Sequence, residues 1–114
     1  MPNEEIITLK DRIVAQLSPL RVYLFGSYAY GTPNEDSDYD FYIVVDDERV
    51  NTHDEAVRAY RAIGFDRTKP VDILVGTNSQ FERRKQWRST IEEEVFGKGV
   101  LLYDAGQPAG RAMA

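Results

Sequence analysis

The sequence contains no cysteine, a single histidine and no long apolar segment. Without cysteine, the chain can form neither a disulfide framework nor a thiolate zinc site, and it has no cysteine nucleophile. No apolar run approaches the roughly 18–20 residues that span a membrane. The acidic start, MPNEEIITLKDR, has no apolar signal core. From these absences we expect a cytoplasmic protein without a membrane partner.

Basic residues are also in the minority, because 14 Lys and Arg stand against 19 Asp and Glu, for a net charge of -5. Non-specific nucleic-acid binding draws its affinity from many Lys and Arg contacts to phosphate, so we expect no direct nucleic-acid binding. A single nucleotide held through metal ions remains compatible with an acidic chain. The 114 residues, 42% of them hydrophobic, suffice for one domain with an ordinary core.

Helix and strand patterns alternate along the chain and predict one α/β layer fold. Apolar spacing, capping residues and turn residues place helices at 3–18, 52–63 and 79–96, and strands at 22–25, 39–45, 71–75 and 100–103. The expected buried positions of the first and last helices are Ile6, Leu9, Ile13, Leu17, Phe81, Trp87, Ile91 and Val95. Thr52 and Glu55 are spaced as a capping box for the middle helix. We expect one domain over residues 1–103 and a flexible tail over 104–114.

Three aspartates stand in or beside the predicted strands. Asp38 and Asp40 stand at the head of the strand at 39–45, and both point to the same side because strand side chains alternate between faces. Two such carboxylates can share a pair of metal ions, and hard oxygen ligands favour Mg²⁺ or Mn²⁺ over zinc. Asp72 interrupts the apolar strand VDILV, where a buried carboxylate is costly unless it is paired, protonated or bound to metal.

Gly26 and Ser27 follow the first predicted strand. A glycine at a strand end lets the backbone approach a phosphate, and Ser27 adds a hydroxyl and an N–H group. No G-K-[ST] sequence follows, so this is not a Walker P-loop. Plainer interpretations stay open: an ordinary Gly-Ser turn, an acidic turn in EDSDYD, and Asp72 as a strand-edge residue facing solvent.

The spacing between Gly26-Ser27 and the aspartates favours the functional interpretations over the plainer ones. Residues 25–45, FGSYAYGTPNEDSDYDFYIVV, contain Gly-Ser, ten intervening residues and Asp-x-Asp, and a lone aspartate follows in a later strand. This pattern resembles the nucleotidyltransferase superfamily related to DNA polymerase β, and the chain length is similar to that of its minimal nucleotidyltransferases. The resemblance implies a polymerase β-like α/β fold, in which helices flank a mixed β-sheet.

The resemblance also implies roles for the residues of the motif. Asp38, Asp40 and Asp72 would bind two Mg²⁺ ions that hold the triphosphate of ATP and activate the incoming hydroxyl. Gly26 and Ser27 would hold the outer phosphates. Two cations suit this chemistry because they neutralise the charge that grows on the attacking and leaving oxygens of an in-line displacement.

Stand-alone minimal members of this family are commonly antitoxins paired with a helical HEPN-type toxin, a ribonuclease. The resemblance therefore implies transfer of AMP from ATP to a tyrosine of such a toxin, in a homo- or hetero-oligomer. Two other functions stay open: neutralisation of the partner by stoichiometric binding, and nucleotidyl transfer to a small molecule. Many minimal members read G-S-x-A-R-G, and Tyr30 stands where that pattern has arginine.

One basic cluster stands apart from this motif and consists of Arg83, Arg84, Lys85 and Arg88. We expect a solvated helix face, with Arg88 and Glu92 spaced for a helical ion pair. The alternative is a surface for an acidic partner or for the triphosphate tail. The single histidine, His53, is expected at the surface.

Overall fold

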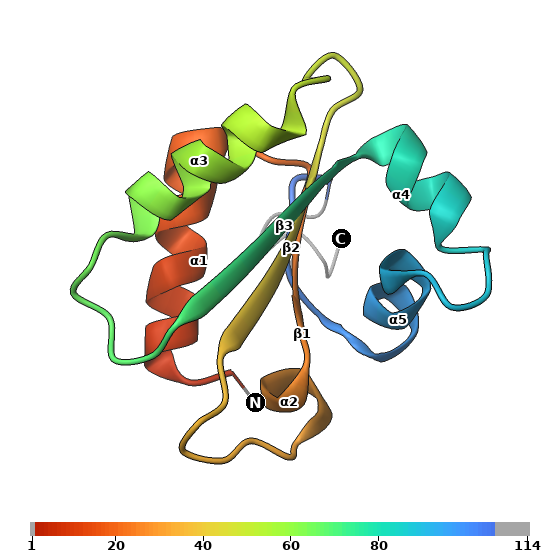
Figure 1. Ribbon diagram of the computed structural model, residues 1–114. Coiled ribbons are helices and arrows are strands. Elements are labelled where there is room, and N and C mark those ends of the chain that lie inside the picture. Colours follow the sequence, from red (N-terminus) through yellow and green to blue (C-terminus); the bar gives the residue numbers. More distant parts are fainter. Residues whose placement is uncertain (1, 107–114) are drawn as a thin grey trace.

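The computed structural model describes residues 2–106 and places helices on both faces of a four-stranded sheet (Figure 1). The helices are α1 (Glu4–Leu17), α2 (Ser27–Tyr30), α3 (Thr52–Ile63), α4 (Asn78–Arg84) and α5 (Ile91–Lys98). The strands are β1 (Arg21–Phe25), β2 (Tyr39–Val45), β3 (Val71–Thr77) and β4 (Val100–Asp104).

The sheet has the order β3-β2-β1-β4, so β3 and β4 form its edges. β1 is antiparallel to β2 and β4, whereas β2 and β3 are parallel. The predicted α/β fold with a mixed sheet is therefore confirmed. β4 extends through Asp104, and most of the predicted tail, 107–114, lies outside the described residues.

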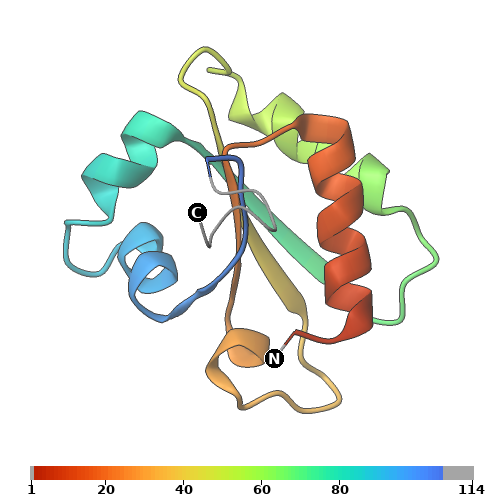
Figure 2. The ribbon, with the colours of Figure 1, turned by 180° about the vertical axis from the view of Figure 1, so that it is seen from behind.

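Two apolar clusters, one on each face of the sheet, form the core. α1 and α3 cover one face, and α4 and α5 cover the other (Figures 1 and 2). β2 supplies both clusters, because Phe41 and Ile43 pack under α1 and α3 while Tyr42 and Val44 pack under α4 and α5. The expected apolar stripe of α1 is fully buried and consists of Ile6, Leu9, Ile13 and Leu17.

The single helix predicted over 79–96 is wrong, because α4 ends at Arg84 and α5 begins at Ile91. Thr90 provides the new start: its side chain accepts a hydrogen bond from the Glu93 N–H at 3.0 Å, and its own hydroxyl donates to the Arg84 carbonyl at 2.7 Å. Trp87 falls in the connecting turn and is 49% exposed rather than buried.

The remaining buried positions expected in this region are confirmed, since Phe81 and Val95 are fully buried and Ile91 is partly buried.

The predicted capping box of α3 is wrong. Asn51 caps that helix by accepting a hydrogen bond from the Asp54 N–H at 3.1 Å, so Thr52 is already its first residue. In residues 2–106, no helix combines the length and apolarity that crossing a membrane requires.

Candidate active site

The three aspartates of the motif lie on one face of the sheet. Asp40 is the second residue of β2 and is in register with Asp72, the second residue of the parallel strand β3. Their neighbours Phe41 and Ile73 pack in the cluster under α1 and α3, so the two carboxylates point to the opposite face, the one that α5 covers. Asp38 precedes Asp40 by two residues at the entry to β2.

The three carboxylates differ in burial. Asp40 is partly buried, whereas Asp38 and Asp72 are exposed. The expectation that Asp72 is a buried, costly carboxylate is wrong, because β3 is an edge strand whose same-face residue Leu74 is also 37% exposed. The alternative interpretation, that Asp72 is an exposed strand-edge residue, is confirmed. The register of β2 and β3 nevertheless places Asp72 beside Asp40.

The pKa of Asp40 reflects the proximity of the other acidic side chains. Burial, and then repulsion by Asp72, Asp38 and Glu94, raise the pKa of Asp40 to about 6. Carboxylate oxygens are the ligands that Mg²⁺ and Mn²⁺ prefer, and a divalent cation would relieve this repulsion. Within the described part of the chain, no three acidic, histidine or cysteine side chains converge tightly enough to form a metal site. The donor chemistry fits a hard cation, with Asp40 at its centre.

Gly26 brings the end of β1 against Asp40. Its backbone has φ +76° and ψ −163°, a conformation open almost only to glycine, and a Cβ atom there would collide with the Asp40 carboxylate. Its carbonyl accepts hydrogen bonds from the N–H groups of Ala29 and Tyr30, both at 3.0 Å, which closes the single turn of α2. The structure therefore brings Gly26 against the Asp40 carboxylate, and Ser27 follows as the first residue of α2.

Tyr30 links α2 to α5. Its hydroxyl donates a hydrogen bond to the Glu94 carboxylate, and burial together with this bond raises the pKa of Tyr30 to about 12. The Lys98 ammonium lies 6.0 Å from the Tyr30 ring centre. Sequence reasoning missed both Glu94 and Lys98. Their spacing of four residues on an amphipathic helix was a visible signal, but the contact with Tyr30, 64 residues before Glu94, was not.

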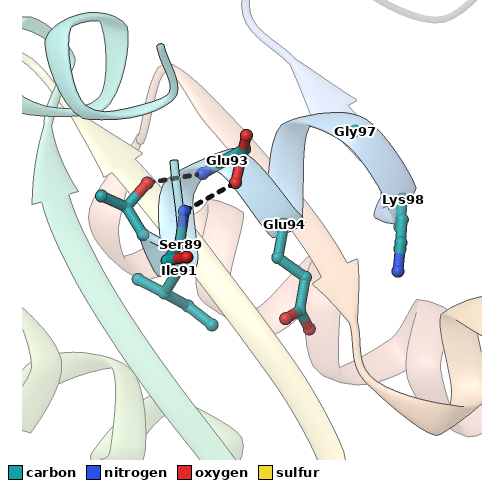
Figure 3. Close-up of a pocket in the computed structure, with 7 residues that line it drawn as sticks. Ser89, Ile91, Glu93, Glu94, Gly97 and Lys98 are labelled. Atoms are coloured by element: carbon teal, nitrogen blue, oxygen red, sulfur yellow. Dashed lines mark hydrogen bonds between the residues drawn. The ribbon is translucent and has the colours of Figure 1, made fainter. Parts of the chain in front are cut away.

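A cleft of about 660 Å³ runs along α5, from residues 89–91 to Gly97 and Lys98 (Figure 3). Glu94 and Lys98 project from the same side of this helix (Figure 3). Glu94 lies close enough to Asp40 to contribute to its raised pKa, so the cleft adjoins the acidic site. A cleft of this size can hold a small ligand.

The basic cluster lies elsewhere. α4 follows the carboxyl end of β3, whereas Asp40 and Asp72 stand at the amino ends of their strands, so α4 and the aspartates occupy opposite ends of the sheet (Figure 1). The Arg83 and Arg84 guanidinium groups lie 5.9 and 5.7 Å from the Trp87 ring centre. Glu92 is 3% exposed and pairs with Arg84 at 3.0 Å instead of with Arg88. His53 is exposed on α3, as expected.

The solved structures that share this fold include the following three. A protein from Sulfolobus solfataricus, described as a candidate nucleotidyltransferase, is 21% identical with a TM-score of 0.63, over 91% of this chain and 81% of that one. A toxin–antitoxin structure with AMP-PNP is 22% identical with a TM-score of 0.54, over 89% and 75% of the two chains. A mutant of the toxin–antitoxin pair MntA–HpeT, with two aspartates replaced by glutamate, is 20% identical with a TM-score of 0.52, over 94% and 77%.

No curated protein matches the chain. The sequence does match the profile of the nucleotidyltransferase domain over residues 6–98, which is most of its length and includes the Gly-Ser turn and all three aspartates. The match agrees with the motif, with the mixed sheet and with the fold of the solved structures, and the chain therefore belongs to the nucleotidyltransferase domain family.

Proposed function

We propose that the chain is a Mg²⁺-dependent nucleotidyltransferase that transfers AMP from ATP to a protein hydroxyl, the tyrosine of a HEPN-type toxin, and thereby acts as an antitoxin in the cytoplasm. The observation that carries this proposal is the register of Asp40 with Asp72, with Gly26 held against the Asp40 carboxylate. A phosphate-binding turn and three neighbouring carboxylates are the parts that nucleotidyl transfer needs.

In this proposal, Asp38, Asp40 and Asp72 hold two Mg²⁺ ions, and Gly26 and Ser27 bind the outer phosphates of ATP. When bound, the ions neutralise charge on the attacking and leaving oxygens. The acceptor hydroxyl approaches past Asp72, which is exposed at the edge of the sheet. Its oxygen bonds to the α-phosphorus as the bond from that phosphorus to the bridging oxygen breaks. The hydroxyl proton passes to solvent water at the exposed edge of the sheet, and pyrophosphate leaves.

The nature of the partner is inferred from the structural relatives. One of them is a toxin–antitoxin structure with AMP-PNP, an analogue of ATP. Another is a toxin–antitoxin pair in which two aspartates, two positions apart, are replaced by glutamate, and Asp38 and Asp40 have the same spacing in this chain. These likenesses favour a toxin as the acceptor and ATP as the donor.

A second candidate function is neutralisation of the partner by stoichiometric binding, without catalysis. Two observations favour it. Tyr30 replaces the arginine of the family pattern and bonds to Glu94 instead of offering a charge to a phosphate. In addition, Asp72 is exposed, so its retention carries little desolvation cost and does not by itself argue for catalysis. No observation favours transfer to a small molecule.

Labelling with α-labelled ATP separates the two functions. The wild-type chain, with Mg²⁺ and a lysate of the native host, is compared with the double variant Asp38→Asn/Asp40→Asn. The control Asp11→Asn/Glu48→Gln removes two exposed carboxylates, one on α1 and one beyond the carboxyl end of β2, at the opposite end of that strand from Asp40. We expect a labelled protein band with the wild type and the control only. If the wild type gave no label and a partner co-purified equally with all three proteins, the stoichiometric function would replace the proposed one.

A further inference from the structure

Glu94 and Lys98 stand four residues apart on α5 but do not form an ion pair. Glutamate followed by lysine at this spacing is the favourable orientation for a pair on a helix. The Glu94 carboxylate instead accepts the hydrogen bond of the Tyr30 hydroxyl. Lys98 takes part in none of the ion pairs found within residues 2–106. Tyr30 thus engages the carboxylate that would otherwise neutralise Lys98.

The Lys98 ammonium lies near Tyr30, the last residue of the short helix that follows Gly26. It lies 6.0 Å from the ring centre of Tyr30, and Tyr30 ends the single helical turn that Ser27 begins. Lys98 is exposed and lines the end of the α5 cleft (Figure 3). A cation that forms no ion pair with the residues of 2–106 therefore stands near the turn that approaches Asp40.

The negative charge around Asp40 gives the Lys98 ammonium its importance for a negatively charged ligand. Asp38, Asp72 and Glu94 all lie near enough to Asp40 to contribute to its raised pKa. A nucleoside triphosphate is itself strongly negative, so it meets repulsion here that metal ions and a basic side chain must offset. The arginine that the family pattern places in the Gly-Ser segment is absent, because position 30 is tyrosine.

We propose that Lys98 binds the phosphate chain of the nucleoside triphosphate, and that the Tyr30–Glu94 hydrogen bond keeps its ammonium available for this contact. The proposal rests on the proposed function and identifies a binding residue for it. Lysine suits this role because its ammonium acts as a point charge for phosphate at the end of a flexible stem. Tyr30 is then a positioning residue that acts through Glu94.

The first test measures binding of AMP, ADP and ATP, each with Mg²⁺, to the wild type, Lys98→Gln, Lys98→Arg and the control Lys10→Gln. Lys10 lies on α1, on the other face of the sheet, and pairs with Asp11, so the control changes the net charge equally. For Lys98→Gln we expect about a tenfold weaker affinity for ATP and little change for AMP, because charge-assisted contacts to phosphate are lost. Lys98→Arg and Lys10→Gln should bind ATP nearly as the wild type does.

The second test measures the coupling to Tyr30. Tyr30→Phe removes only the hydroxyl, which frees Glu94 to pair with Lys98, so ATP affinity should fall by about twofold, because an exposed ion pair at this helical spacing is weak. Tyr30→Phe/Glu94→Gln removes the competing carboxylate and should restore ATP binding. Adding Tyr30→Phe to Lys98→Gln should cause no further loss.

The outcomes separate this inference from the proposed function. If the wild type binds ATP and transfers AMP while Lys98→Gln binds the three nucleotides as Lys10→Gln does, the role of Lys98 is refuted and the proposed function stands. If Tyr30→Phe leaves ATP affinity unchanged, the role of Tyr30 is refuted. A wild type that binds none of the nucleotides overturns the proposed function and this inference together. Thermal melting of each variant verifies that it is folded.

Discussion

Replacing Gly26 with alanine should displace the Asp40 carboxylate more than it unfolds the protein. The new Cβ atom would meet the Oδ2 and Cγ atoms of Asp40, which belong to the mobile end of a side chain, so the carboxylate can turn away. The backbone at φ +76° and ψ −163° adds strain of about 1–3 kcal/mol for alanine. At 2 kcal/mol, this corresponds to a melting temperature lower by on the order of 10 °C.

The matched control is Gly31→Ala. Gly31 also has a positive φ, of +82°, but a Cβ atom there meets no atom within 4 Å. It therefore reproduces backbone strain of about 1–2 kcal/mol without the collision. Only Gly26→Ala should lower the rate of nucleotidyl transfer, by about a hundredfold, because a displacement of about 1 Å in a reacting group has this effect.

Thermal unfolding and labelling with α-labelled ATP, carried out on both variants, measure the two effects separately. The reasoning is refuted if Gly26→Ala transfers AMP as fast as Gly31→Ala does. It is also refuted if Gly26→Ala prevents folding altogether, because the structure then could not accommodate the Cβ atom by moving Asp40 alone.

Three further predictions concern stability. The native pKa of Asp40, about 6, lies above the ordinary value of 3.8, so the folded chain holds an extra proton between about pH 4 and 6. In metal-free buffer the free energy of unfolding should therefore fall as pH rises through this window. Asp72→Asn removes one of the charges that repel the Asp40 carboxylate, so the free energy of unfolding, measured by urea titration, should fall less over this pH window. An unchanged fall would contradict repulsion of Asp40 by Asp72. Tyr42→Phe should lower the free energy of unfolding by about 1–3 kcal/mol in urea, since the buried Tyr42 hydroxyl donates to the Glu92 carboxylate at 2.7 Å. Gly97→Ala should raise the melting temperature slightly. Gly97 lies in the last turn of α5, where alanine is favoured over glycine by up to about 1 kcal/mol, and a Cβ atom there meets open space. A lower melting temperature would argue against this placement in α5.

Features encoded locally were predictable from the sequence. The stripe of Ile6, Leu9 and Ile13 repeats at the helical period, and it is buried as expected. The strand YDFYIVV was found with its observed bounds because its composition and its flanking turn both favour it. The break between α4 and α5 was missed because apolar residues continue at helical spacing across it, although Thr90 already carried a helix-start signal.

The candidate site also combines features that the local sequence predicts with features that depend on the tertiary fold. The common orientation of Asp38 and Asp40 follows from the alternation of a single strand and needs no tertiary information. The pairing of Asp40 with Asp72 requires β2 and β3 to be parallel neighbours in one register, which no local pattern determines. The exposure of Asp72 depends on β3 being an edge strand, and the Tyr30–Glu94 contact depends on how α5 folds back over the sheet.

That exposure bears on the kind of acceptor that the site can serve. A small molecule is usually enclosed over most of its surface by the protein that binds it. Asp72 and Leu74 instead lie open on a strand that borders only β2 in the sheet, so a large partner can reach Asp72 along this edge without entering a cavity. α5 packs against β1, which borders β2 on the side away from β3, so the α5 cleft lies across β2 from Asp72. An arrangement with a nucleotide on the α5 side and a hydroxyl arriving past β3 would place donor and acceptor on opposite sides of Asp40, and it favours a protein acceptor over a small molecule.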